Sequence, residues 1–71
     1  MEYFIQNYKE NKELLGTENT TFVHDAKNMV KVNNGLLRHK PSMQTDEIRI
    51  YSYTNLYNEK THKLIKTIRI K

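Results

Sequence analysis

The clearest structural pattern of this chain lies in its last third, residues 46–71, which reads DEIRIYSYTNLYNEKTHKLIKTIRIK. Two runs rich in β-branched and aromatic residues flank the polar residues 58–62, and this pattern is typical of a β-hairpin. We expect the two strands to span residues 47–57 and 63–70. A hairpin is unstable alone in water, so the rest of the chain must cover one of its faces.

The two faces of this hairpin differ in chemistry, because side chains alternate across a strand. Even-numbered positions supply an apolar face that we expect to lie in the core: Ile48, Ile50, Leu56, Leu64, Ile68 and Ile70. Odd-numbered positions supply cations and aromatic rings: Arg49, Tyr51, Tyr53, Tyr57, Lys63, Arg69 and Lys71. We predict that this odd face is the binding site, because cations contact phosphates and aromatic rings stack on bases.

The register of the hairpin follows from matching apolar residues across its two strands. One register pairs Ile50 with Ile70, Ser52 with Ile68 and Leu56 with Leu64, and it leaves residues 59–61 as the loop. A register two residues away is also compatible with the pattern. It would place Arg49 opposite Arg69, and like charges directly opposed are unfavourable, so we favour the first register.

Residues 2–15 are predicted to form a helix. Apolar residues approximate the i, i+3, i+4, i+7 pattern of a core-facing stripe: Met1, Phe4, Ile5, Tyr8 and Leu15. Gly16 would follow the helix at a position that needs a positive φ, which glycine adopts without steric cost. Residues 39–46 contain Pro41 and no apolar periodicity, so we expect the longest loop there.

Residues 20–39 fit two structures. A helix over 21–33 would begin at Thr20 as N-cap and end at Asn34-Gly35. Alternatively, Asn34-Gly35 would form a type I′ hairpin turn between two strands. The hairpin would place Lys31 opposite Arg38, which is unfavourable, so we favour the helix and keep both alternatives open.

These elements predict an α+β fold in which one or two helices pack on a small antiparallel sheet with a C-terminal β-hairpin. The 71 residues are expected to form a single small domain, residues 1–71. A chain this short has a small core, and a homodimer is one way to enlarge it. The helices would cover the even face of the hairpin and leave the odd face open.

Several classes of protein are disfavoured by the sequence. The absence of cysteine fits a reducing compartment, and no apolar run approaches a membrane span or a signal sequence, so we expect a soluble cytoplasmic protein without a membrane partner. The spacing of His24, His39 and His62 matches no zinc site, and no nucleophile or phosphate-binding motif is present. We therefore expect no enzymatic activity, no metal and no cofactor.

The charge balance favours a binding function. The formal net charge is +4, which attracts nucleic acid or acidic protein surfaces. The leading prediction is a small basic nucleic-acid-binding or regulatory protein that contacts DNA or RNA through the odd face. The alternative is an inhibitor, encoded by a phage or mobile element, that binds an acidic surface on a host protein. The abundance of Asn, Lys, Ile and Tyr, which have AT-rich codons, fits such an origin.

Overall fold

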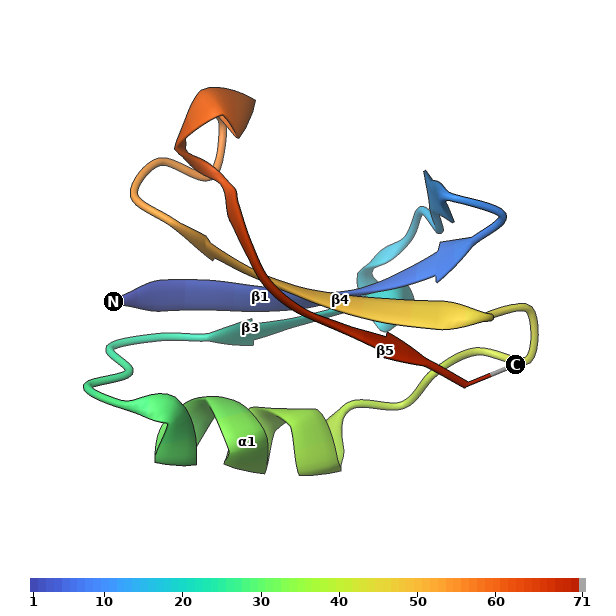
Figure 1. Ribbon diagram of the computed structural model, residues 1–71, viewed down its shortest axis with the longest axis horizontal. Helices are drawn as coiled ribbons and strands as arrows, with labels where there is room; N and C mark the ends of the chain where they lie inside the picture. The colour runs from blue at the N-terminus through green and yellow to red at the C-terminus, as the bar shows by residue number, and fades with distance from the viewer. Residues whose placement is uncertain (71) are drawn as a thin grey trace.

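The computed structural model describes residues 1–70, in which a five-stranded antiparallel sheet carries one α-helix on one of its faces (Figure 1). The strands are β1 (Glu2–Lys9), β2 (Lys12–Glu13), β3 (Thr20–Val23), β4 (Glu47–Tyr53) and β5 (Lys63–Arg69), and the helix is α1 (Met29–Arg38). Two short 3-10 helices, η1 (Thr17–Asn19) and η2 (Glu59–Thr61), lie in the connections. The predicted α+β class, with a helix on an antiparallel sheet and a C-terminal hairpin, is confirmed.

Strand β1 is the centre of the sheet. The strand order is β2-β1-β4-β5, and β3 also pairs with β1 along the edge that β2 uses. The pairing of β1 with β4 sets Ile5 opposite Ile50 and Phe4 opposite Tyr51. Because directly opposed residues share a face, Ile5 and Ile50 point toward α1, whereas Phe4 and Tyr51 point away from it.

The helix predicted for residues 2–15 is wrong, because this segment forms strands β1 and β2. Five consecutive residues of β1, 3–7, are buried, so both faces of the strand are covered. In a strand buried on both faces, adjacent positions such as Phe4 and Ile5 are both apolar, and periodicity alone cannot distinguish this pattern from a helical stripe. Gly16 does have a positive φ, of 105°, but it precedes η1 and does not terminate an α-helix.

Residues 20–39 match neither predicted alternative completely. Residues 20–23 form β3, and the helix begins later, at Met29, where the Asn28 side chain accepts a 3.0 Å hydrogen bond from the backbone N–H of Val30. Asn34-Gly35 lies inside α1, so it forms neither a helix end nor a hairpin turn. A Cβ on Gly35 would lie 2.5 Å from Cγ2 of Val23, and the glycine therefore permits the close approach of α1 to β3. The loop predicted for 39–46 is confirmed.

The C-terminal hairpin exists, but its predicted register is wrong. Ile48 pairs with Ile68 and Ile50 with Lys66, and the register then shifts at a bulge between Ile50 and Tyr51. Beyond the bulge, Tyr51 is opposite Leu64 and Ser52 is opposite Lys63, and β4 ends at Tyr53 instead of Tyr57.

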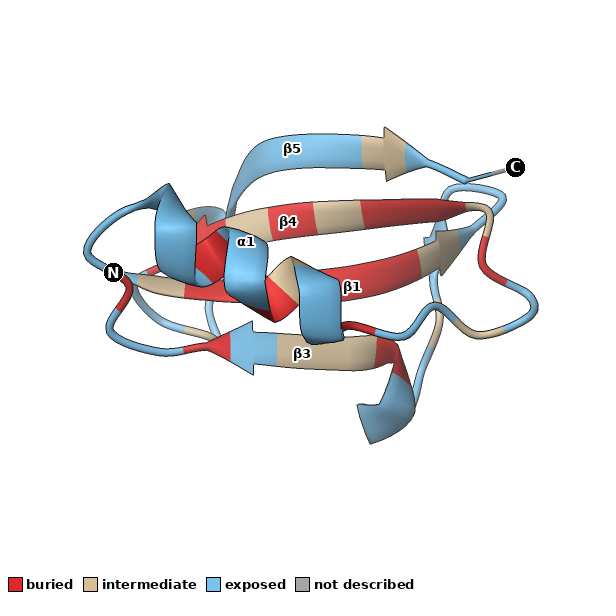
Figure 2. Ribbon diagram, turned by 90° about the horizontal axis from the view of Figure 1, so that it is seen from below, coloured by how far each residue is buried: buried red, intermediate tan, exposed pale blue. Residues whose placement is uncertain are grey.

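The reason for this register is that β5 is an edge strand, and Figure 2 shows it exposed along most of its length. Leu64 and Ile70 are 54% and 42% exposed, so core burial does not select the predicted pairing. The observed register instead places Glu47 opposite Arg69, with 3.2 Å between Glu47 Oε1 and Arg69 Nη1. The observed register thus keeps one apolar pair, Ile48 with Ile68, and adds an opposite-charge pair beside it.

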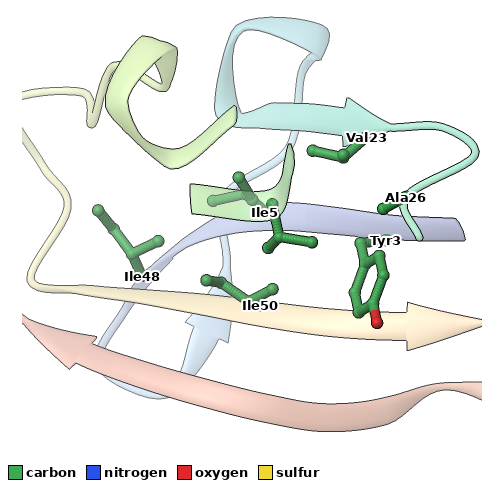
Figure 3. Packing of buried hydrophobic residues seen from close by; sticks show 7 residues of the cluster. Tyr3, Ile5, Val23, Ala26, Ile48 and Ile50 are labelled. Carbon is green, nitrogen blue, oxygen red and sulfur yellow. The ribbon is translucent and has the colours of Figure 1, made fainter. Parts of the chain in front are cut away.

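The apolar core lies between α1 and the sheet (Figure 3). Its buried members are Tyr3, Ile5, Val23, Ala26, Val32, Ile48 and Ile50. The prediction for Ile48 and Ile50 is confirmed, and Ile68 is half-buried against this cluster. Leu56 is also half-buried but lies outside the cluster, and Leu64 and Ile70 are exposed, contrary to expectation.

A buried polar network ties β1 to the loop after α1. The side-chain amide of Asn7, which is fully buried, donates to Oδ1 of Asn19 at 3.0 Å, and Asn7 Oδ1 lies 2.7 Å from Nε2 of His39. Nε2 of His39 must therefore donate, and in the neutral ring Nδ1 accepts from the Thr21 hydroxyl at 2.6 Å. Burial lowers the pKa of His39, which favours this neutral form.

The network predicts that stability decreases at acidic pH. The pKa of His39 is lower in the folded chain than in the unfolded chain, so the stabilisation is complete above about pH 6.5 and is lost as the pH falls below it. Urea unfolding between about pH 7.5 and pH 5.5 should show a decreasing free energy of unfolding, by at most about 1.4 kcal/mol per pH unit for this one proton. The His39→Gln variant should have a lower free energy of unfolding, and this free energy should change less with pH than that of the original protein. If the free energy of unfolding changed equally with pH in both proteins, the assignment of this effect to His39 would be contradicted.

Candidate binding groove

The sheet face opposite α1 carries a cluster of aromatic rings centred on Phe4. The Phe4 ring stacks on Tyr51 with 5.1 Å between centroids, and it forms a T-shaped pair with His62 with 5.2 Å between centroids. Tyr53 and Phe22 lie 5.7 and 6.3 Å from the same ring. These rings come from three strands and from the end of the β4–β5 connection, and the strand pairing brings them together.

Two segments rise above this face and form the walls of a groove. Figure 1 shows the β1–β2 hairpin and the β4–β5 connection on the side of the sheet opposite α1. The β4–β5 connection is held closed by internal hydrogen bonds, since His62 Nε2 donates to the Leu56 carbonyl at 3.0 Å and the Thr61 hydroxyl donates to the Asn55 carbonyl at 2.8 Å. The other wall is fixed by the Gln6 amide, which donates to the Leu14 carbonyl at 2.7 Å.

The groove consists of two adjoining hollows of about 330 and 300 Å³. Both hollows are lined by Phe4, Glu13, Glu59 and His62. The first is also lined by Tyr8 and Tyr51, and the second by Gln6, Thr20, Phe22, Leu56 and Tyr57. Glu13 and Glu59 have no ion-pair partner among residues 1–70, so two uncompensated carboxylates border an aromatic floor.

The arginines of this face are engaged by a carboxylate. Glu47 pairs with Arg49 and with Arg69. The hydrogen bond from Arg49, supported by Arg69, holds the pKa of Glu47 below its usual range, so Glu47 stays charged. The Arg49 guanidinium also lies 4.0 Å from the centroid of the Tyr8 ring, and this contact is a cation–π interaction within the chain.

The hydroxyl groups of Tyr8 and Tyr51 form a hydrogen bond with each other. Their oxygens are 3.1 Å apart, and burial together with this hydrogen bond raises the pKa of Tyr8. The Tyr8 phenol is therefore neutral near pH 7, and the rings of Tyr8 and Tyr51 both line the first hollow.

The structure separates the predicted site residues. Tyr51 lines the groove, Tyr57 is 96% exposed at its rim, and Tyr53 is buried at 9% exposure. Lys63 is opposite Ser52, on the α1 side of the sheet, because the bulge reverses the alternation of β5. Its placement beside Tyr51 is thus wrong, and Lys71 lies outside the described residues.

Several groove residues were absent from the predicted site: Phe4, Gln6, Tyr8, Glu13, Phe22, Glu59 and His62. The signal that could have found three positions is the alternation of Phe4, Gln6 and Tyr8, which share one face if residues 2–9 are read as a strand. The positions of Glu13 and Glu59 depend on the path of the connections, which local patterns do not specify.

The described residues were also searched for a metal site and for a membrane-spanning helix. These residues contain no group of three or more His, Cys, Asp or Glu side chains that could hold a metal ion. No helix in the described chain is long and apolar enough to span a membrane.

Comparisons with protein-family models, curated proteins and solved structures gave no significant match.

The burial of the tyrosines predicts different roles for two residues expected at one site. Tyr53→Ala should lower the free energy of unfolding by about 3 kcal/mol, because it removes a buried ring that packs on Phe4. Tyr57→Ala, at an exposed position, should change it by less than about 0.5 kcal/mol. Urea unfolding measures both values, and similar losses in the two variants would contradict this arrangement.

Proposed function

We propose that the protein is a non-catalytic binding protein that docks on a polypeptide partner through the groove. The observation that carries this proposal is an aromatic floor bordered by the carboxylates of Glu13 and Glu59. Aromatic side chains are enriched in the central contacts of protein interfaces, where their burial contributes much of the affinity. A protein of this kind acts by occupying the surface of its partner, so regulation or inhibition of that partner is the expected consequence.

The charges of the groove favour a polypeptide over a nucleic acid. Glu13 and Glu59 would repel a phosphate backbone along the floor. Two arginines share the face of Tyr51, Arg49 and Arg69, and both are engaged by Glu47, so they have less charge to offer a phosphate.

Nucleic-acid binding remains the second candidate, and it would use a different surface. Lys60, Lys63 and Lys66 are exposed along the C-terminal hairpin, outside the two hollows of the groove, and could contact phosphates there. The net charge of +4 would support an electrostatic contact there.

Site-specific photo-crosslinking tests the proposal. A photoreactive phenylalanine analogue would replace Tyr57, at the groove rim, and in a matched control it would replace Leu37, which is 84% exposed on α1. In extracts of the organism that encodes the protein, the Tyr57 position should give a discrete adduct that protease removes and nuclease does not. The Leu37 position should give none.

The same experiment identifies the outcomes that contradict the proposal. A nuclease-sensitive adduct at Tyr57 would support the second candidate. Equal adducts at both positions, or none at either, would show that the groove is not a preferred contact surface. Fluorescence anisotropy with labelled DNA and RNA at two salt concentrations complements the crosslinking. We expect no saturable binding of either nucleic acid.

A further inference from the structure

We infer that the groove recognises a cationic side chain, lysine or arginine, of the polypeptide partner. The site is the part that the two hollows share, which is lined by two aromatic rings, Phe4 and His62, and two carboxylates, Glu13 and Glu59. This inference rests on the proposed function and adds to it the chemistry of the group that enters the groove.

The chemical composition of the site matches a cation. The face of an aromatic ring carries negative electrostatic potential and attracts ammonium and guanidinium groups. The first hollow is lined by rings of Phe4, Tyr8, Tyr51 and His62. Carboxylates on opposite walls add attraction, and neither Glu13 nor Glu59 is paired with a cation within residues 1–70. A cationic side chain would supply the charge that the site lacks.

The chain itself shows that this surface accepts a cation. Arg49 already places its guanidinium 4.0 Å from the Tyr8 ring centroid, on the same face of the sheet. Its charge is shared with Glu47, so the internal cation does not neutralise Glu13 or Glu59. The partner's side chain would repeat this arrangement in the neighbouring hollow.

The site is rigid and of suitable size. Phe4 lies on the central strand and is buried, and the two walls are fixed by the hydrogen bonds from Gln6 to Leu14 and from His62 to Leu56. A volume of about 330 Å³ is at the lower end of ligand pockets, which suits one long side chain better than a larger molecule. A preformed site reduces the ordering cost of binding.

Other occupants fit the charges less well. A phosphate or carboxylate would face Glu13 and Glu59 and be repelled. An uncharged apolar side chain would remove water from both carboxylates without providing a compensating partner. The lysine or arginine side chain is therefore the occupant that the geometry favours.

A matched pair of probes tests the inference on the full chain. Nα-acetyl-lysine methylamide and Nα-acetyl-norleucine methylamide have the same backbone and a similar aliphatic chain, but only lysine carries the ammonium group. In an amide NMR titration at constant ionic strength, the lysine probe should cause saturable shifts at Phe4, Glu13, Tyr51, Glu59 and His62. The norleucine probe should cause weak or no shifts at these residues.

Charge-neutral variants identify the carboxylates responsible. Glu13→Gln and Glu59→Gln should each lower the affinity for the lysine probe about two- to fivefold, as expected for the loss of one exposed charge. Glu18→Gln removes an exposed carboxylate that does not line either hollow of the groove, and it should leave the affinity unchanged. Dispersed spectra of all three variants would show that the fold is intact.

Each remaining outcome has a definite meaning. Equal shifts with the two probes, or no saturable shifts with either, would overturn the inference while leaving a protein-docking role to the crosslinking result. An effect of Glu18→Gln as large as that of Glu13→Gln would show that general charge, and not the groove, attracts the probe. Saturable shifts at the same residues with inorganic phosphate would overturn both the inference and the proposed function.

Discussion

The structure depends on covering both faces of β1. Ile5 points to the side of α1 and is fully buried, whereas Phe4 points to the opposite side and is also buried. A sheet with one helix layer would normally leave Phe4 in water. Here the neighbouring rings and the β4–β5 connection cover it, so the second face acquires an aromatic cluster of its own. This cluster is the floor of the groove.

The division of charge follows from the same arrangement. Arg49 and Arg69 lie on the face of the aromatic cluster, and Glu47 holds both of them near the ends of β4 and β5. Glu13 and Glu59 lie on the walls, which leaves them without a cation among the residues described. The protein is basic overall, yet its groove is bordered by acidic groups, and net charge is therefore a poor guide to what the groove binds.

The sequence predicted the fold class and part of the core, since the alternation around Ile48 and Ile50 marks a strand with one face in the core. It failed at β1, because Phe4 and Ile5 are both buried and adjacent, which imitates a helical stripe. It failed at β5, because burial does not constrain an edge strand and Glu47 pairs with Arg69 there. Because of the bulge, Lys63 lies on the opposite face of the sheet from Tyr51. Of the expected binding face, Tyr51 and Tyr57 belong to the groove, whereas Glu13 and Glu59 depend on long-range folding of the connections.

The groove exists only if the β4–β5 connection folds over the sheet and closes one of its sides. A nuclear Overhauser experiment on the aromatic protons tests it directly, because the ring centroids of Phe4 and His62 are 5.2 Å apart. We expect cross-peaks between these two rings. If those cross-peaks were absent while the core contact between Ile5 and Ile50 gave its own, the sheet would be present without the wall, and the groove would not exist.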